Sequence, residues 1–393
     1  MSTVLVLGGY GNAGAKICSL LLAHSEHTVR IGGRNLGRAQ SMVEELGTAD
    51  ATWPARLQPV AVDARDRVGL ERALEGVDLC IAAAGTSADA TTAVRAALAV
   101  GSDYLDIQVS RDKADRLLTM DAEARASGVT VVTDGGFHPG VPAAMVRYAD
   151  QRLGGIERAL VASVIAVDWA ALRPIADSTV AEMMEEFRDF SYEEYRSGRW
   201  GSASAVPTFT FPVPFGRRKA VAMGLAEMHQ LTVAMPALRD TGFYVGGFNP
   251  VVDYAVIPVA MAGMRIAPDR LGRPLGRLLH WGLIRFSRPP YGTVLQLDGN
   301  APGRRPTTLM RISHPDAYSV TAAPTVAAAL QILDGTARRP GVHTQAMLVE
   351  PTRFFTDQSA MGISVEWLGD TSQSAVPRPD LAAPQAPDDR TSP

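Results

Sequence analysis

The chain has 393 residues, 46% of them hydrophobic and 20% charged, which suits about two to three folded domains and excludes disorder throughout. Its net charge of −3 offers no overall basic field for nucleic acid or an anionic membrane. The two cysteines, Cys18 and Cys80, lack zinc-site spacing and cannot build a disulfide framework, so we expect no metal site. With no export-signal pattern at the first residues and no apolar run of the ~20 residues that a membrane helix needs, we expect a cytoplasmic protein without a membrane span.

Short apolar runs alternate with helical patterns between residues 3 and 140, as in a parallel sheet built from βαβ units. The predicted strands are 4–7, 28–31, 57–62, 79–83, 104–107 and 129–132, and the predicted helices are 14–24, 37–45, 69–74, 88–100 and 113–127. This rhythm predicts an α/β fold, a Rossmann doubly wound sheet.

The pattern changes after residue 140. Longer elements follow, among them a helix that we expect to be capped by Thr179 with Glu182 three residues on, and they indicate a second domain of α+β character. The tail over 371–393 has no apolar period and is predicted to be disordered.

A glycine-rich loop follows the first predicted strand. Gly9, Gly11 and Gly14 stand in GxGxxG register at the mouth of a helix, where glycines allow a tight turn, approach of a diphosphate and close packing of helix on strand. We expect the loop to bind a dinucleotide at the positive end of the helix dipole, through Gly9, Tyr10, Gly11, Asn12, Ala13 and Gly14.

The end of the second predicted strand indicates which dinucleotide is bound. It runs into Gly33 and Arg34 without the carboxylate that binds the ribose hydroxyls of NAD. Arg34, with Arg38 one turn later, can instead pair with a 2′-phosphate, which predicts NADP. A surface arginine that only contacts water is the alternative.

Two later loops also follow predicted strands, and ligands bind at the carboxyl ends of strands in open α/β sheets. Asp63 and Ala64 follow the third strand and are expected near the adenine. Ala84 and Gly85 follow the fourth, where small side chains let the cofactor pass closely.

These residues together resemble the saccharopine dehydrogenase-like oxidoreductases. The opening GGYGNAGAKI, Arg34, the strand end Tyr104-Leu105-Asp106, the turn Gly135–Gly140 and the closing segment from Pro340 to Ile363 carry the resemblance. It implies a Rossmann domain at 1–140, an inserted α+β substrate and dimerisation domain at 141–325, and a segment at 326–370 that returns to the nucleotide domain. It also implies a homodimer and hydride transfer to or from a C=N bond of an imine or secondary amine. Some relatives reduce C=C bonds instead.

Hydride transfer also requires a proton donor in most cases. His138, after the sixth predicted strand, is the best-placed candidate, with Asp106 at the end of the fifth as a second. Tyr104 and Tyr318 are weaker, because a tyrosine in an apolar run more often belongs to the core. Each candidate has a structural alternative, namely a loop hydrogen bond for His138 and an orienting role for Asp106.

Three functions remain open at this point. The first is an NADP-dependent oxidoreductase acting on a small-molecule C=N substrate. The second is an enoyl or carbonyl reductase for a bulkier apolar substrate, if the aromatic residues of the middle region line the cleft. The third is a dinucleotide sensor that has lost the chemistry.

Overall fold

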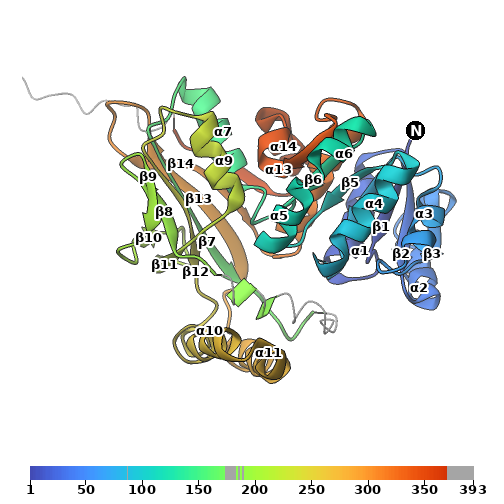
Figure 1. Ribbon diagram of the computed structural model, residues 1–393. Helices are drawn as coiled ribbons and strands as arrows, with labels where there is room; N and C mark the ends of the chain where they lie inside the picture. The colour runs from blue at the N-terminus through green and yellow to red at the C-terminus, as the bar shows by residue number, and fades with distance from the viewer. Residues whose placement is uncertain (86, 173–182, 185, 188–189, 370–393) are drawn as a thin grey trace, which may run out of the picture.

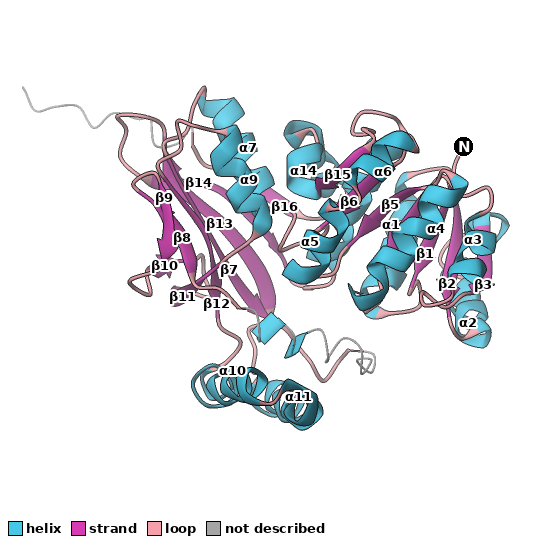
Figure 2. Ribbon diagram, in the orientation of Figure 1, coloured by secondary structure: helices cyan, strands magenta, loops and turns pink. Residues whose placement is uncertain are grey.

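The computed structural model describes residues 1–85, 87–172, 183–184, 186–187 and 190–369, and in it the chain forms two sheets that lie side by side (Figures 1 and 2). The predicted cap at Thr179 and Glu182 and the predicted disordered tail at 371–393 lie outside these residues.

The first sheet has seven parallel strands in the order β15-β6-β5-β4-β1-β2-β3, and it confirms the predicted doubly wound fold. Its strands are β1 (Thr3–Leu7), β2 (Thr28–Gly33), β3 (Leu57–Ala61), β4 (Leu79–Ala82), β5 (Asp103–Asp106), β6 (Thr130–Thr133) and β15 (Gly341–Thr344). The helices packed around it are α1 (Asn12–His24), α2 (Leu36–Gly47), α3 (Arg67–Leu74), α4 (Ala90–Val100), α5 (Arg111–Leu118), α6 (Asp121–Ala126) and α12 (Ser319–Leu333), with short 3-10 turns η1 (Trp53–Arg56) and η2 (Ser87–Asp89).

Both faces of this sheet are covered because alternate residues of each strand point to opposite sides. Val4 and Val6 of β1 join the core that contains α1, α2 and α12. Leu5 and Leu7 join a second core with α3 and α4. A strand buried on both faces reads as a continuous apolar run, which is why the sequence pattern located it.

The predicted helix at 113–127 is wrong in one respect, because the chain forms two helices there, α5 and α6. The Thr119 hydroxyl bonds back to the Arg116 carbonyl at 2.7 Å and closes α5. Asp121 then begins α6, and its carboxylate accepts the N–H of Val342 in β15 at 2.9 Å. A contact with a strand more than two hundred residues away therefore sets the break.

The second sheet is mixed, with the order β10-β11-β12-β7-β13-β14-β16, and β8 and β9 attached at β12. Its strands are β7 (Arg158–Ala166), β8 (Glu193–Arg196), β9 (Arg199–Ser202), β10 (Thr208–Thr210), β11 (Arg217–Met223), β12 (Asp240–Gly246), β13 (Gly292–Asn300), β14 (Thr307–His314) and β16 (Ser364–Trp367). The helices of this part are α7 (Pro142–Leu153), α9 (Ala226–Ala234), the π-helix η3 (Val252–Val256), α10 (Ile257–Ile266), α11 (Pro268–Phe286), α13 (Gln345–Leu348) and α14 (Pro351–Ala360).

Most aromatic residues of the middle region are core residues. Phe243 lies in the large core beneath α7 and α9, which is continuous with the core of the nucleotide sheet. Phe209, Phe211 and Tyr244 pack on the opposite face of the second sheet.

The C-terminal part of the chain contributes to both sheets. Within the predicted returning segment 326–370, β15 pairs with β6 of the first sheet, whereas β16 pairs with β14 of the second. The return to the nucleotide domain therefore ends before β16. The reason is that Ile363 is buried in the large core and Trp367 packs edge-on against Tyr148 of α7 at 5.7 Å between ring centroids. No helix in the described ranges is both long and apolar enough to cross a bilayer.

Candidate functional site

A cavity of about 860 Å³ opens at the carboxyl edge of the first sheet. The loops after β1, β2, β3, β4 and β5 all reach it, as expected for a binding crevice in an open α/β sheet. From the other side it is bounded by the start of α12 and by residues 183 and 186. Among the predicted cofactor residues, those that line it are Tyr10, Gly11, Asn12, Ala13, Arg34, Arg38, Asp63, Ala64, Ala84 and Gly85.

The two remaining predicted residues, Gly9 and Gly14, lie behind the lining and shape it. A Cβ on Gly14 would stand 2.2 Å from the carbonyl oxygen of Gly8, so only glycine lets α1 approach the strand end this closely. The helix begins at Asn12 after Gly11, without a side-chain cap and without an acidic residue in its described first turn. Asn12 and Ala13 of its first turn line the cavity, so the positive end of the helix dipole is directed at a bound anion.

Three guanidinium groups lie at the β2 and β3 side of the cavity. Arg34 and Arg38 follow β2, and Arg65, which the sequence reasoning missed, follows β3. The Arg38 guanidinium stacks over the Tyr10 ring, 4.7 Å from its centroid, and the Tyr10 hydroxyl accepts the N–H of Asn35 at 3.2 Å.

Asp63 keeps its charge in this cluster. Its hydrogen bonds with Arg65, one of them 2.6 Å long, are the main reason that the pKa of the carboxyl falls to about 2, and the charge of Arg34 contributes to this lowering. A sequence signal for Arg65 was present in its position two residues after Asp63, at the same strand end. Three arginines against the carboxylates of Asp63 and Asp89, which also lines the cavity and acts on Arg65, leave a net positive charge for a bound phosphate. The residues present therefore fit the 2′-phosphate of NADP.

On the other side of the glycine loop, a side chain from the segment after β5 holds the loop after β4. The amide of Gln108 donates to the carbonyl of Ala82 at 3.2 Å and to that of Ala84. Ala84 in turn packs against Gly8, where a Cβ would stand 2.8 Å from the Ala84 methyl group. The small residues predicted here therefore bring the β4 loop directly against the glycine loop.

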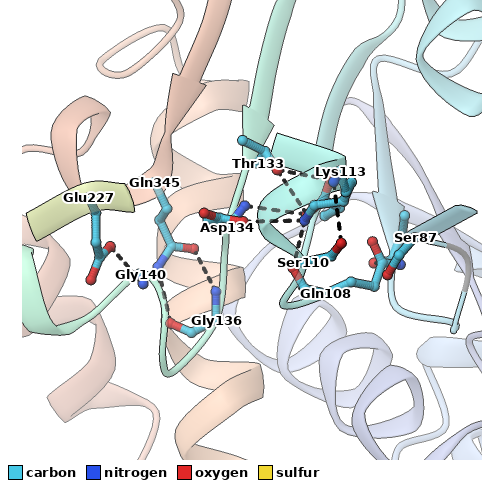
Figure 3. A network of polar contacts seen from close by, with 12 residues as sticks. Ser87, Gln108, Ser110, Lys113, Thr133, Asp134, Gly136, Gly140, Glu227 and Gln345 are labelled. Carbon is cyan, nitrogen blue, oxygen red and sulfur yellow. Dashed lines mark hydrogen bonds and ion pairs between the residues drawn. The ribbon is translucent and has the colours of Figure 1, made fainter. Parts of the chain in front are cut away.

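The predicted catalytic residue Asp106 is part of a buried ion cluster rather than of the cavity lining. Its carboxylate pairs with Lys113 Nζ at 2.5 Å, and Lys113 also lies 3.3 Å from Asp134. The ammonium further donates to the carbonyl of Gln108 at 2.6 Å, and Figure 3 shows this network from close by. The cluster ties the ends of β5 and β6 to α5, so the structure places Asp106 where it orients the cavity loop.

Burial is the largest single influence on the pKa of each charged group in this cluster. It raises the pKa of Asp106, against the opposing effect of Lys113. It also raises the pKa of Asp134 to about 6, again against Lys113. For Lys113, burial lowers the pKa, but the two carboxylates outweigh it and the pKa ends above its ordinary value.

The linker between the two sheets, residues 134–141, is held by side chains from far along the sequence (Figure 3). Gln345 of α13 pairs with Gly136, and Glu227 of α9 accepts the N–H groups of Gly140 at 2.8 Å and Ala143 at 3.2 Å. Burial raises the pKa of Glu227 to about 8 despite these bonds. The linker is therefore fixed by side chains from two helices of the second part of the chain.

The structure places His138 in the core at this linker. Its ring lies 4.7 Å from that of Phe137 and 5.5 Å from that of Phe243, centroid to centroid, and it is not among the described residues that line the cavity. Burial lowers its pKa to about 4, so the imidazole is neutral at pH 7. The geometry does not favour His138 as a proton donor, and its predicted catalytic role receives no support from its position.

Two groups that line the cavity, Glu186 and Tyr318, have a pKa that burial raises. Glu186, which the sequence reasoning missed, is partly buried there, and burial raises the pKa of its carboxyl to about 7. Tyr318, at the start of α12, also lines it; burial raises the pKa of its hydroxyl, opposed by a hydrogen bond with Asn12. No local motif marks Glu186, because its burial and its place at the cavity depend on the packing of residues distant in the sequence.

Comparison with known proteins agrees with this site. Residues 4–132 match the family model of the saccharopine dehydrogenase NADP-binding domain. No curated protein sequence matches the chain significantly.

Several solved structures are similar in fold. The apo saccharopine dehydrogenase (L-Glu forming) from Saccharomyces cerevisiae matches with a TM-score of 0.65 and 13% identity, over 93% of this chain and 99% of that one. A mutant meso-DAPDH from Clostridium tetani E88 matches with a TM-score of 0.44 and 10% identity, over 90% and 96% of the two chains. The C. glutamicum DAP dehydrogenase gives a TM-score of 0.43 and 12% identity, over 91% and 98%. The match to the yeast saccharopine dehydrogenase shows that the fold is shared. The other two matches have TM-scores below 0.5 and carry no further argument.

The glycine loop, the arginine cluster and the family match therefore lead to the same result. Residues 4–132 are an NADP-binding domain similar to that of saccharopine dehydrogenase, and the chain as a whole shares the fold of a saccharopine dehydrogenase.

Proposed function

We propose that the protein transfers a hydride between NADP(H) and the C=N bond of an imine or secondary-amine substrate. The observation that carries the proposal is that one cavity is lined by both the arginine cluster and the protonatable Glu186. When bound, the nicotinamide supplies or accepts the hydride, and the protein must orient the reactants, exclude water and move a proton.

The proton transfer is assigned to Glu186. Its pKa of about 7 means that both protonation states are populated at neutral pH, which suits a general acid or base acting in either direction. In the reducing direction the carboxyl proton goes to the substrate nitrogen as the carbon receives the hydride. In the oxidising direction the carboxylate takes that proton back.

We infer that the substrate binds near Gln108 and Thr321, which line the same cavity as Glu186. Gln108 is held by the carbonyls of the β4 loop, and Thr321 contacts the linker, since a Cβ on Gly136 would lie 3.1 Å from its methyl group. Both side chains stand on elements fixed by buried contacts. Their rigidity would limit the orientations open to a bound substrate.

A second candidate function is reduction of a C=C or C=O bond in a bulkier apolar substrate. Ile107, Val109 and Met183 line the same cavity and favour an apolar group there. The third reading, a dinucleotide sensor without turnover, shares the arginine cluster but makes no use of Glu186.

The test is incubation of the pure protein with NADPH deuterated at C4 and a panel of imines, enals and ketones, with mass spectrometry of the products. Deuterium at the former imine carbon supports the proposal, and deuterium in the enal or ketone products supports the second candidate. NADPH binding without deuterium transfer to any class contradicts both and leaves the sensor. We also propose a cytoplasmic homodimer, which sedimentation velocity and fractionation test directly.

A further inference from the structure

The hairpin formed by η3, α10 and α11 has an unusually apolar outer face. Eight of the seventeen large hydrophobic residues that are exposed in the described part of the chain lie within residues 251–284. We define the outer face of the hairpin by its five most exposed members, Tyr254, Val259, Ile266, Trp281 and Ile284.

These side chains are not needed to hold the hairpin together. Leu275, Leu279 and Leu283, spaced by four residues along α11, form its inner face and pack in a core with α10. Ile266 is 81% exposed and Trp281 is 54% exposed. Scattered single hydrophobic residues are normal on a protein surface, but a gathered patch marks an interaction site.

The hairpin carries a net positive charge. Residues 251–288 contain six arginines and two aspartates, a net charge of +4 in a chain whose net charge is −3. All six arginines are exposed. Asp253 is half-buried and its carboxylate accepts the N–H of Phe248 at 2.8 Å.

This charge argues against a second copy of the chain as the occupant. A twofold interface brings the same patch of both copies together, and here it would place arginines against arginines. The outer face therefore fits a partner with an apolar interior and a negatively charged surface. Helices with arginines and tryptophan beside aliphatic residues insert shallowly into membrane interfaces, where arginine side chains reach the headgroups.

We propose that the outer face of the α10–α11 hairpin docks on an anionic lipid bilayer surface, with Ile266 and Trp281 inserted at the level of the headgroups and the arginines bound to lipid phosphates. The hairpin projects beyond the ends of β12 and β13 of the second sheet, away from the helices of the nucleotide sheet (Figure 1). Nothing in the nucleotide domain has to move for this face to meet a membrane.

Docking would also place the cavity close to the bilayer. Met184 and Phe187 pack in the same core as α10 and α11, and their neighbours Met183 and Glu186 line the cavity. The docking itself does not rest on the proposed reaction.

The experiment is flotation of the full-length protein with vesicles of phosphatidylcholine alone or mixed in equal parts with phosphatidylglycerol, at low and high salt. We expect binding to the mixed vesicles, at least tenfold weaker binding to the neutral ones, and loss of binding as salt screens the charges. Reversal of Arg270 and Arg277 to glutamate should lower the partition coefficient at least tenfold, because each basic residue near an anionic surface contributes roughly fivefold. Ile266→Glu with Trp281→Glu should also lower it at least tenfold.

The matched controls are Val233→Glu on α9 and Arg72→Glu on α3, exposed residues of the same types elsewhere. They should bind vesicles as the parent does, and every variant should keep the parent affinity for NADPH, which shows that it is folded and separates this result from the site chemistry. Absence of binding to mixed vesicles, or equal binding by the hairpin variants, overturns the proposal. A dimer that becomes a monomer on Ile266→Glu with Trp281→Glu, without vesicle binding by the parent, would identify the face as an interface between copies instead.

Discussion

The side-chain amide of Gln345 is paired with both backbone polar groups of Gly136. Its Oε1 accepts the N–H of Gly136 at 3.0 Å, and its Nε2 donates to the carbonyl of Gly136 at 3.2 Å. These two hydrogen bonds have the same arrangement as those between paired residues of neighbouring strands, although the two residues are 209 positions apart in the chain. They fix the linker at a residue with φ of 94°, a conformation that glycine adopts without strain.

Gln345→Ala is expected to destabilise the fold measurably. It leaves two buried backbone groups unpaired, and each such group costs about 1–3 kcal/mol. Urea unfolding followed by circular dichroism gives the value, with Gln40→Ala on the exposed side of α2 as the control. A loss no larger than that of the control would mean that the pair contributes nothing to stability.

Arg34→Ala should weaken NADPH binding about 10 to 100-fold and leave NADH binding nearly unchanged. A charge-assisted contact with a phosphate contributes roughly 1.5–3 kcal/mol, and NADH lacks the phosphate. Fluorescence titration with both cofactors measures the ratio, and Arg72→Ala, exposed on α3, is the control. An unchanged preference would assign 2′-phosphate recognition to Arg38 and Arg65, which the same substitution in each would then test.

Glu186→Gln should lower turnover at least 100-fold while NADPH affinity stays within about twofold, because proton transfer by a positioned side chain contributes typically 10²–10⁴-fold. The pH profile of kcat should lose the ionisation near 7 that the raised pKa of Glu186 predicts. Tyr318→Phe, at the same cavity, is the comparison. If Tyr318→Phe alone abolishes turnover and removes that ionisation, the hydroxyl rather than the carboxyl donates the proton.

His138→Phe should leave turnover within about threefold of the parent, since the ring lies outside the described cavity lining. A tenfold loss with folding intact would restore the predicted donor role.

The same variant should change the pH dependence of stability. The folded pKa of about 4 lies below the ordinary value of 6.5, so the native state binds fewer protons between these values. The His138 contribution is therefore present above pH 6.5 and is lost as the pH falls through 4, by up to about 3 kcal/mol. The difference in unfolding free energy between parent and variant should follow that course, and a constant difference from pH 7 to 4 would contradict the burial.

Asp106→Asn should destabilise the protein by about 3–5 kcal/mol, the usual cost of removing one partner of a buried ion pair. Thermal unfolding with NADPH present and absent measures it. The double variant with Lys113→Met, which removes both charges, should regain part of the loss. A direct catalytic role would instead show as lost turnover in a double variant whose stability has recovered.

The amino-acid sequence by itself determined the features that depend on neighbours in the chain. Strands such as β1, β4 and β6 are apolar runs buried on both faces, and the spacing of Gly9, Gly11 and Gly14 fixes a backbone turn, so both could be predicted. The seventh strand of the first sheet, β15, was not predicted. Arg34 was predictable because the end of β2 lies at a known distance from that turn.

Only the tertiary structure decided the features that depend on residues distant in the sequence. His138 is adjacent to the strand end in the chain, yet Phe243 from β12 covers it and removes it from the cavity. Glu186 acquires its raised pKa from burial. The hairpin shows the same principle for charge. The net charge of the whole chain is −3, and this number does not reveal that the hairpin exposes six arginines. Burial and local field are sums over all neighbours in space, and composition and spacing along the chain do not contain them.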